Sequence, residues 1–173
     1  KRTKVLVDEA YLDFTDQPSL ANLVTENKNL IIAKTFSKIY GLAGARIGYA
    51  LAHPETITEM SQVDFSTSGS DSILSASGAL ASLKDNKFVA ETISLNAEAR
   101  KYTIEQLEKL KIPCIQSHTN FVYFSIENYE KDFFEQLKKN AILGTKIYEE
   151  KGKWSRITIG TMDEMKEFIK ALG

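Results

Sequence analysis

Three short apolar segments at the start of the chain constrain its fold most strongly. They are KVLVDEA at 4–10, NLIIAKTFS at 29–37 and ARIGYALA at 45–52. Their length and lack of clean alternation are typical of strands covered on both faces. SLANLVTENK at 19–28 predicts a crossover helix with Ser19 as its N-cap, so the first two strands should be parallel. The third segment follows a short glycine loop without room for a crossover, which predicts an antiparallel strand.

The middle of the chain predicts helices. PETITEMSQV at 54–63 begins with a proline, and the Ser-, Ala- and Gly-rich stretch 66–84 predicts a second, closely packed helix. After a polar break at 85–87, apolar residues at helical spacing predict a long amphipathic helix over 88–111. Pro113 marks its end.

The last third of the chain alternates strands and helices. Strands are expected at 120–126 and 155–161, a short or edge strand at 142–148, and helices at 130–140 and 162–172. We therefore expect an α/β protein. Its parts should be a portion of a larger sheet domain (1–86), a long connecting helix (87–112) and a small α/β domain (113–173).

The composition narrows the class of partner. The formal net charge is −1 and apolar runs are short, so neither nucleic acid nor a membrane is expected as a partner. Cys114 is the single cysteine, which excludes an internal disulfide and fits a reducing, cytoplasmic location. No metal-ligand spacing is present, so no metal site is expected. Because the chain opens on a strand-like segment without Met, we expect the C-terminal part of a longer protein.

Lys38 follows the second apolar segment and precedes the glycine turn GLAG at 41–44. Three interpretations stay open from the residues alone. An exposed loop lysine is the commonest case, and a phosphate-binding lysine is the second, although the GxxxxGK[ST] pattern is absent. The third is a desolvated nucleophile that forms a Schiff base with a carbonyl cofactor.

The neighbours of Lys38 favour the third interpretation. The glycine turn folds the chain back and should bring Arg46 beside Thr35, Ser37 and Lys38. Two hydroxyls and a guanidinium make a good phosphate pocket, since arginine grips phosphate oxygens bidentately. A cofactor with both an aldehyde and a phosphate would use all of these side chains, and pyridoxal 5′-phosphate (PLP) is such a cofactor.

Asp8 and Tyr11, in VDEAY at 7–11, lie at the end of the first apolar segment. Ligands of open α/β sheets bind beyond the carboxyl ends of the strands, so Asp8 and Lys38 should face one crevice. A carboxylate there would keep the pyridine nitrogen of PLP protonated, and Tyr11 could reach the ring's phenolic oxygen. Taken alone, DEAY predicts only a strand-end turn with solvated acids.

Four motifs together carry a family resemblance: VDEAY at 7–11, TFSKIYGLAGARIGY at 35–49, SHTNFVYF at 117–124 and SRITIGTMDEM at 155–165. They resemble the PLP-dependent aminotransferases of fold type I, class I/II, and within that family are most similar to the histidinol-phosphate aminotransferases. The resemblance implies the C-terminal part of the large PLP-binding domain, with a mixed, mostly parallel sheet, plus the small domain. It also implies a homodimer that uses an amino donor and a 2-oxo acid.

The resemblance implies roles for the residues around the cofactor. Lys38 would hold PLP covalently and act as the general acid/base. Asp8 would pair with the pyridine nitrogen and Tyr11 with the phenolic oxygen. The cofactor phosphate would be held by Thr35, Ser37 and Arg46.

The resemblance also implies where substrate binds. Arg156 in SRITIG matches the family's arginine for the substrate's acidic group, and Asn120 lies near that arginine in family members. From the residues alone, a strand-edge arginine in an ion pair and a turn asparagine are equally open. Family members usually carry an arginine in a G-[IV]-x-[VI]-R segment, where this chain has Lys146 at or near that place. Lysine lacks the bidentate fork, which leaves a phosphorylated substrate open.

Other functions also stay open. A PLP-dependent decarboxylase of the threonine-phosphate type shares the scaffold, and an aminotransferase-like regulatory module would be non-catalytic. An inactive C-terminal fragment would serve only as structure. The family's N-terminal half supplies further contacts to PLP, so we expect the 173-residue chain alone to bind PLP weakly and not to turn over substrate.

Overall fold

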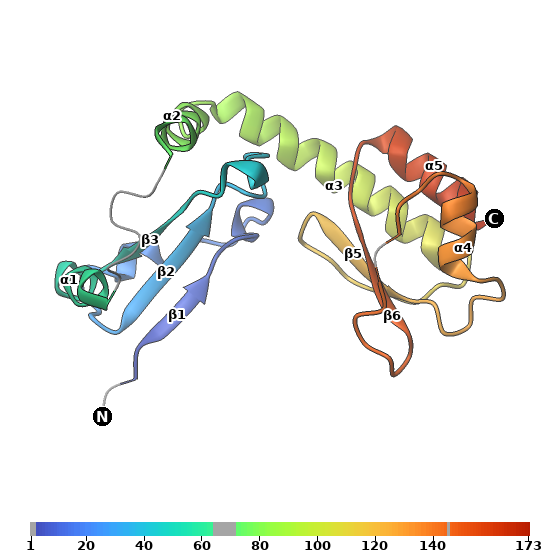
Figure 1. The fold of residues 1–173 in the computed structure, drawn as a ribbon, viewed down its shortest axis with the longest axis horizontal. Helices are drawn as coiled ribbons and strands as arrows, with labels where there is room; N and C mark the ends of the chain where they lie inside the picture. The colour runs from blue at the N-terminus through green and yellow to red at the C-terminus, as the bar shows by residue number, and fades with distance from the viewer. Residues whose placement is uncertain (1–2, 64–71, 145) are drawn as a thin grey trace. The chain divides into compact units, whose positions relative to one another are not determined.

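The computed structural model describes residues 3–63, 72–144 and 146–173, which form two compact units, Lys1–Ala90 and Glu91–Gly173 (Figure 1). The long helix α3 (Asn86–Lys109) begins in the first unit and continues into the second. The expected division at residues 86 and 112 stays a prediction.

The first unit contains a three-stranded sheet in the order β1-β2-β3. As predicted, the first two strands are parallel and the third is antiparallel to the second. The bounds are β1 (Val5–Asp8), β2 (Leu30–Thr35), β3 (Gly48–Ala52), α1 (Pro54–Val63) and α2 (Ile73–Ser82). Both helices were expected, although residues 66–71 of the second expected helix lie outside the described residues.

The crossover between β1 and β2 is not the predicted α-helix. It begins with a short 3-10 helix, η1 (Leu12–Phe14), and at the place of the predicted helix it has a second one, η2 (Leu20–Leu23), followed by turns. Ser19 does cap it, since its hydroxyl accepts a hydrogen bond from Ala21 N at 3.1 Å. Thr25 and Asn27 are poor helix formers, and the Asn27 side chain instead accepts a hydrogen bond from the backbone of Asn29. The local side-chain bonds therefore end the helix after one turn.

The sheet of the first unit is less covered than its sequence predicted. Strand β2 is buried at Leu30–Ile32, and a small core forms around Val24, Leu30 and Ile32. On β1, by contrast, Val5 and Leu6 are 52% and 63% exposed. The expectation of strands covered on both faces is therefore wrong within this chain for β1 and also for β3, whose first three residues are exposed.

The second unit contains an antiparallel sheet in the order β4-β5-β6. The bounds are β4 (Cys114–Ile115), β5 (Phe121–Ser125), α4 (Phe133–Lys139), β6 (Trp154–Thr158) and α5 (Met162–Leu172). The short strand β4 was not predicted. The strand expected at 142–148 is also wrong, because the described residues there are irregular and pairing occurs only as an isolated bridge between Glu149 and Trp154.

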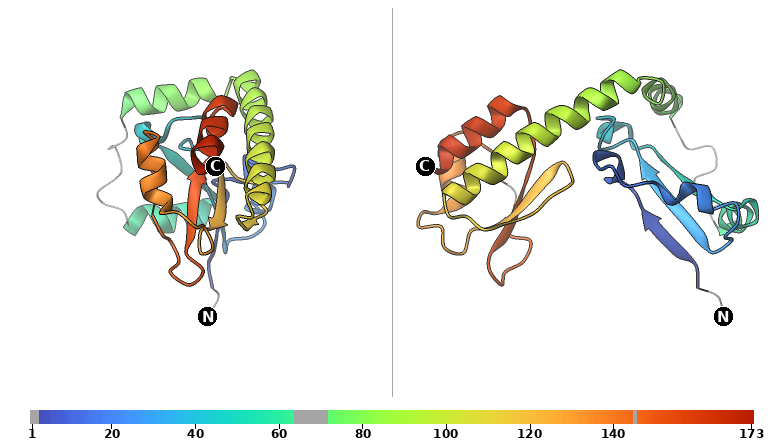
Figure 2. Two further views of the ribbon diagram at one scale, coloured as in Figure 1. Left: turned by 90° about the vertical axis from the view of Figure 1, so that its right-hand side faces the viewer. Right: turned by 180° about the vertical axis from the view of Figure 1, so that it is seen from behind.

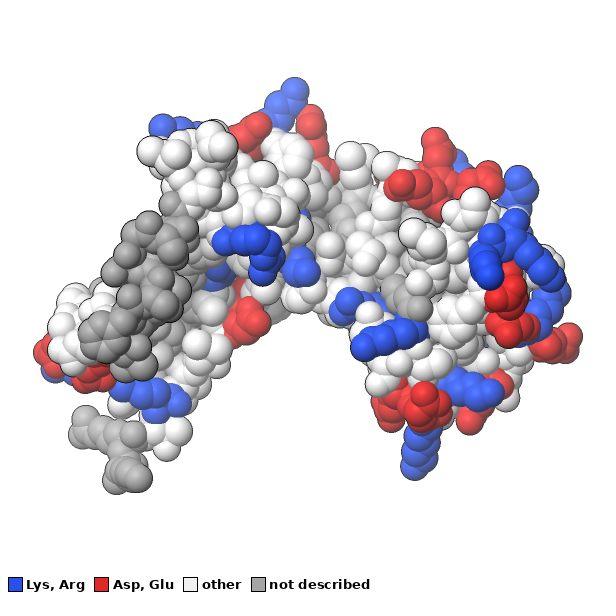
Figure 3. Space-filling view, in the orientation of Figure 1, with Lys and Arg blue, Asp and Glu red and all other residues white. Residues whose placement is uncertain are grey.

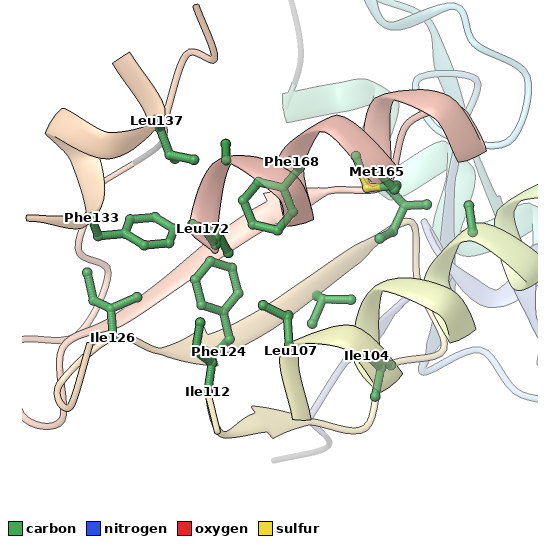
Figure 4. Close-up of a cluster of buried hydrophobic side chains, with 14 residues drawn as sticks. Ile104, Leu107, Ile112, Phe124, Ile126, Phe133, Leu137, Met165, Phe168 and Leu172 are labelled. Atoms are coloured by element: carbon green, nitrogen blue, oxygen red, sulfur yellow. The ribbon is translucent and has the colours of Figure 1, made fainter. Parts of the chain in front are cut away.

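One face of this second sheet is covered by helices α3, α4 and α5 (Figure 2). Side chains alternate along a strand, so the inward residues Val122 and Phe124 of β5 pack against helical side chains. Phe124 contacts Phe133 of α4 and Phe168 of α5, at 5.5 and 6.3 Å between ring centroids (Figure 4). Cys114 of β4 packs against the same core, and burial, together with the charge of Glu108, raises the pKa of its thiol.

The opposite face of this sheet carries Phe121, Tyr123, Trp154 and Arg156, and we call it the outer face. The register places Tyr123 opposite Arg156, and alternation along the strands puts Phe121 and Trp154 on the same side. Helices α3, α4 and α5 pack on the core face, and the four residues of the outer face are half-buried.

Charged side chains of both signs are interspersed on the face of the molecule shown in Figure 3, in keeping with the net charge of −1. Within the described residues, no helix combines the length and apolar character that crossing a membrane requires.

Candidate active site

Several of the expected cofactor residues gather at one edge of the first unit's sheet. Asp8 and Thr35 are the last residues of the parallel strands β1 and β2, so both strands end at the same edge. Lys38 follows three residues after Thr35. Its side chain is half-buried, and Nζ lies 5.4 Å from the centroid of the Tyr11 ring. The structure therefore places the amine of Lys38 beside the ring of Tyr11.

The return loop that carries Arg46 is held tightly to the end of β2. Thr35 pairs with Gly48, and Phe36 N donates to Ile47 O at 3.2 Å, so Arg46 follows directly on this pairing. A Cβ atom added at Gly48 would lie 2.6 Å from Lys34 O, which explains the glycine there. The end of the second apolar segment and the start of the third are therefore held side by side in an antiparallel pair.

Arg46 itself adopts an unusual backbone conformation, with φ at 51° in the left-handed region. This conformation costs a non-glycine residue about 1–2 kcal/mol. Its exposed side chain donates from Nη1 to Ala43 O at 3.0 Å. Lys111, Ala141 and Lys153 also have a positive φ, so the conformation by itself does not mark a binding site.

The other polar groups of this edge make local hydrogen bonds. Thr35 Oγ1 accepts from Ser37 N at 3.1 Å, and the exposed Asp8 carboxylate accepts from Ala10 N at 2.9 Å. No salt bridge joins Asp8 to Lys38 in the part of the chain that the structure describes. Both residues lie at the same edge of the sheet.

A buried ion-pair network lies directly behind this edge, and sequence reasoning missed it. Lys34 Nζ lies 3.1 Å from Asp13 Oδ1 and 3.4 Å from Glu9 Oε2. Glu9 is only 4% exposed and also accepts hydrogen bonds from Ser19 Oγ at 2.7 Å and Leu20 N at 2.9 Å. The expectation of solvated acids in DEAY is therefore right for Asp8 and wrong for Glu9. The sequence did contain a signal for this network, which is Lys34 inside an apolar strand. A buried ammonium group needs a carboxylate partner.

The network shifts the pKa values of both its buried members. Burial raises the pKa of Glu9, but hydrogen bonds from Ser19 and Leu20 and the charge of Lys34 outweigh it and hold the pKa below its ordinary 4.5. Burial lowers the pKa of Lys34, whereas Asp13 and Glu9 hold it above its ordinary 10.5. Both groups are therefore charged at neutral pH, and they tie the segment after β1 to β2.

In the second unit, Arg156 lies on the outer face among aromatic rings. Its guanidinium carbon is 4.8 Å from the centroid of the Phe121 ring and 5.0 Å from that of Tyr148. Lys146 Nζ lies 5.2 Å from the same Tyr148 ring. The interpretation of Arg156 as a strand-edge surface arginine therefore misses these aromatic contacts, which the alternation of Phe121 and Tyr123 could have indicated.

Asn120 precedes β5, and its backbone oxygen accepts a hydrogen bond from Ile159 N at 2.8 Å. The adjoining turn is fixed by Arg100, whose Nη1 donates to Thr119 O at 2.9 Å and to Asn96 Oδ1 at 2.7 Å. The role of Asn120 near the substrate stays a prediction.

The side chains at the edge of the first unit suit PLP chemically. A half-buried amine (Lys38) is present for the aldehyde and a carboxylate (Asp8) for the ring nitrogen. Hydroxyls at the end of β2 and a guanidinium in a backbone conformation disfavoured for non-glycine residues are suited to a phosphate. The donor set therefore fits the cofactor that the motifs indicate.

Comparisons with known proteins show the family of the chain. The family model described as aminotransferase class I and II matches residues 1–172. A histidinol-phosphate aminotransferase of Moorella thermoacetica is 35% identical over 97% of this chain and 44% of its own length. The chain thus spans about half the length of the curated relatives it matches. It belongs to the aminotransferase class I and II family.

Solved structures share the fold. The crystal structure of histidinol-phosphate aminotransferase from Sinorhizobium meliloti in complex with pyridoxal-5′-phosphate superposes with a TM-score of 0.85 at 27% identity, covering 98% of this chain and 48% of that one. A decarboxylase from Sulfurospirillum multivorans has a TM-score of 0.81 at 21% identity, over 98% of this chain and 51% of that one. At that identity the second likeness shows the fold alone.

Proposed function

We propose that the complete protein is a PLP-dependent aminotransferase. It would transfer an amino group between an amino acid, or an amino alcohol phosphate such as histidinol phosphate, and a 2-oxo acid. The observation that carries this proposal is the placement of Lys38 against Tyr11, beyond the shared end of strands β1 and β2 where Asp8 lies. The names of the curated relatives support histidinol phosphate as the donor.

Each residue has a defined task in this proposal. PLP, when bound, supplies an electron sink that stabilises negative charge at the substrate's α-carbon. Lys38 Nζ would take a proton from that carbon and deliver it to the C4′ carbon of the cofactor, as a general acid/base. The Asp8 carboxylate would keep the ring nitrogen protonated, and Tyr11 would donate to the phenolic oxygen. The phosphate would be bound by Thr35, Ser37 and Arg46.

The substrate's carboxylate would be oriented by Arg156, because a guanidinium binds a carboxylate bidentately. Lys146 approaches the Tyr148 ring that Arg156 also contacts, and it adds a second positive charge. A second positive charge suits a substrate with a further anionic group. The family resemblance also supports a homodimer as the working form.

Replacing Lys38 with alanine in the complete protein tests the proposal. Amino transfer from histidinol phosphate and from a panel of amino acids to 2-oxoglutarate should fall about 100-fold or more, because the general acid/base is lost. The product amino acid is quantified by chromatography. Lys84→Ala is the matched control, since Lys84 is an exposed lysine of the same unit, and it should retain wild-type activity.

Two outcomes would overturn the proposal. Release of CO₂ without amino transfer would identify a decarboxylase of the same fold. Equal activity of the wild-type protein and the Lys38→Ala variant would show that Lys38 is not the general acid/base.

A further inference from the structure

We propose that Tyr148 is a positioning residue, which holds the guanidinium of Arg156 in the orientation that binds a substrate carboxylate. This inference rests on the proposed function for the identity of the substrate, but its geometry is that of the outer face alone. Tyr148 precedes β6, and its backbone N–H donates to Trp154 O at 2.8 Å. The tyrosine is therefore anchored beside the strand that carries Arg156.

The ring of Tyr148 contacts three side chains of this region. Arg156 lies 5.0 Å from its centroid and Lys146 lies 5.2 Å from it. The Tyr123 ring meets it edge-on, at 6.5 Å and 70°, and Tyr123 in turn stacks on Trp154 at 5.3 Å and 16°. Tyr148 thus connects both cations to a stacked aromatic pair of the sheet.

Two rings lie close to the guanidinium of Arg156, with centroids 4.8 Å from its carbon for Phe121 and 5.0 Å for Tyr148. Arginine carries five N–H donors, and these two ring contacts restrict where the guanidinium that bears them can lie. A carboxylate needs two of those donors in one plane for a bidentate interaction. A guanidinium already held in place loses less side-chain entropy when the carboxylate binds.

Lys146 brings a second positive charge to the same ring, and this charge can attract an anion. Its ammonium and the Arg156 guanidinium both approach one uncharged ring, whose negative face attracts cations. Removing the ring would leave two positive groups without the contact that orients them. Tyr148 is 44% exposed, so a substrate anion can approach it from solvent on this unit.

The test compares Tyr148→Leu, which removes the ring, with Tyr148→Phe, which keeps it. In the complete holoenzyme, Tyr148→Leu should raise the KM for the amino acid about 5- to 10-fold, the range expected for a cation–π contact, and change kcat less than about 2-fold. Tyr148→Phe should stay within about 2-fold of the wild type in both constants. Thermal unfolding of each variant reports whether the fold is preserved.

A binding measurement without catalysis separates this inference from the proposed function. Succinate, a dicarboxylate that cannot undergo amino transfer, is titrated while tryptophan fluorescence is recorded. Subtracting the signal of Trp154→Phe isolates Trp154, whose ring stacks on Tyr123 beside Tyr148. The Kd should rise about 5- to 10-fold in Tyr148→Leu and hardly at all in Tyr148→Phe.

The Arg156→Lys background completes the test. If Tyr148 acts through Arg156, Tyr148→Leu should raise the Kd clearly less once the guanidinium is gone, because only the contact with Lys146 is then lost. An undiminished effect in that background, equal binding by Tyr148→Leu and wild type, or no binding of succinate by the wild type would overturn the inference. Tyr148-dependent succinate binding without amino transfer would leave the inference standing and reject the proposed function.

Discussion

Glu9 joins the segments that lie behind the candidate site. Its carboxylate binds Lys34 of β2 and also accepts hydrogen bonds from Ser19 and Leu20 of the crossover. Glu9→Gln removes the negative charge and puts an NH₂ group where a carboxylate oxygen accepted a hydrogen bond. A donor then faces a donor, so the free energy of unfolding should fall by about 1–3 kcal/mol. Denaturant unfolding at pH 7 measures the loss. Glu26→Gln is the control, since Glu26 is an exposed acid of the same crossover.

The effect of Glu9→Gln should depend on pH in one direction. The pKa of Glu9 is lower in the folded chain than its ordinary 4.5, so its stabilisation is present above 4.5 and is lost as the pH falls through the folded value. The difference in unfolding free energy between the wild type and Glu9→Gln should therefore shrink in acid. A difference that stays constant from pH 7 to acid pH would show that the carboxylate's charge contributes nothing.

The site residues illustrate what single positions reveal in a sequence. Lys38, Tyr11 and Asp8 were predicted as site residues because a recognisable motif surrounds each, and the placement of the strand ends at one edge followed from the apolar segments. The roles of the three residues stay predictions. The backbone conformation of Arg46 could not, because a positive φ in a non-glycine residue depends on the surrounding loop. The burial of Glu9 was missed because its partners Lys34 and Ser19 are distant in sequence.

At the scale of elements, the contact between β2 and β3 depends on the absence of a side chain at one position. Gly48→Ala should lower the free energy of unfolding by about 1–3 kcal/mol, because its Cβ would lie 2.6 Å from Lys34 O and would push the strands apart. Thermal unfolding measures the change. Gly44→Ala is a close control, since a Cβ there meets no atom within 4 Å and the φ angle is not positive. Equal effects of the two substitutions would contradict the steric explanation.

The predicted elements differ in how well the sequence defined them. Helices α1, α3 and α5 and strands β2, β5 and β6 have strong apolar patterns, and the predictions place them correctly apart from their ends. The crossover was wrong because capping and turn-forming side chains outweighed a weak helical pattern. The segment before β6 was wrong because β-branched residues there pack around the sheet without pairing along it, as Ile147 does against the core.

At the scale of the whole chain, the two units have separate cores of unequal size. The core of the second unit joins α3, α4, α5 and β5, whereas the core of the first is built around Val24, Leu30 and Ile32. In hydrogen exchange of the 173-residue chain, amides of β5 and α5 should therefore be protected more strongly than those of β1, an edge strand with exposed apolar residues. Mass spectrometry resolves these segments. Equal protection of β1 and β5 would contradict this ranking.

Strand β1 shows where prediction from the sequence failed at the scale of the whole chain. The sequence pattern predicted a strand covered on both faces, while Val5 and Leu6 are exposed within this chain. The chain matches about half the length of its curated relatives, so an apolar pattern can report burial that these residues alone do not provide.

The partly buried Cys114 has a practical consequence for chemistry on this chain. Maleimides and similar reagents react with thiolates, and the raised pKa of Cys114 keeps its sulfur mostly protonated at neutral pH. A cysteine introduced at an exposed position would therefore be alkylated in preference to the native one. Fluorophores or spin labels could then be attached to a chosen surface without first removing the natural thiol.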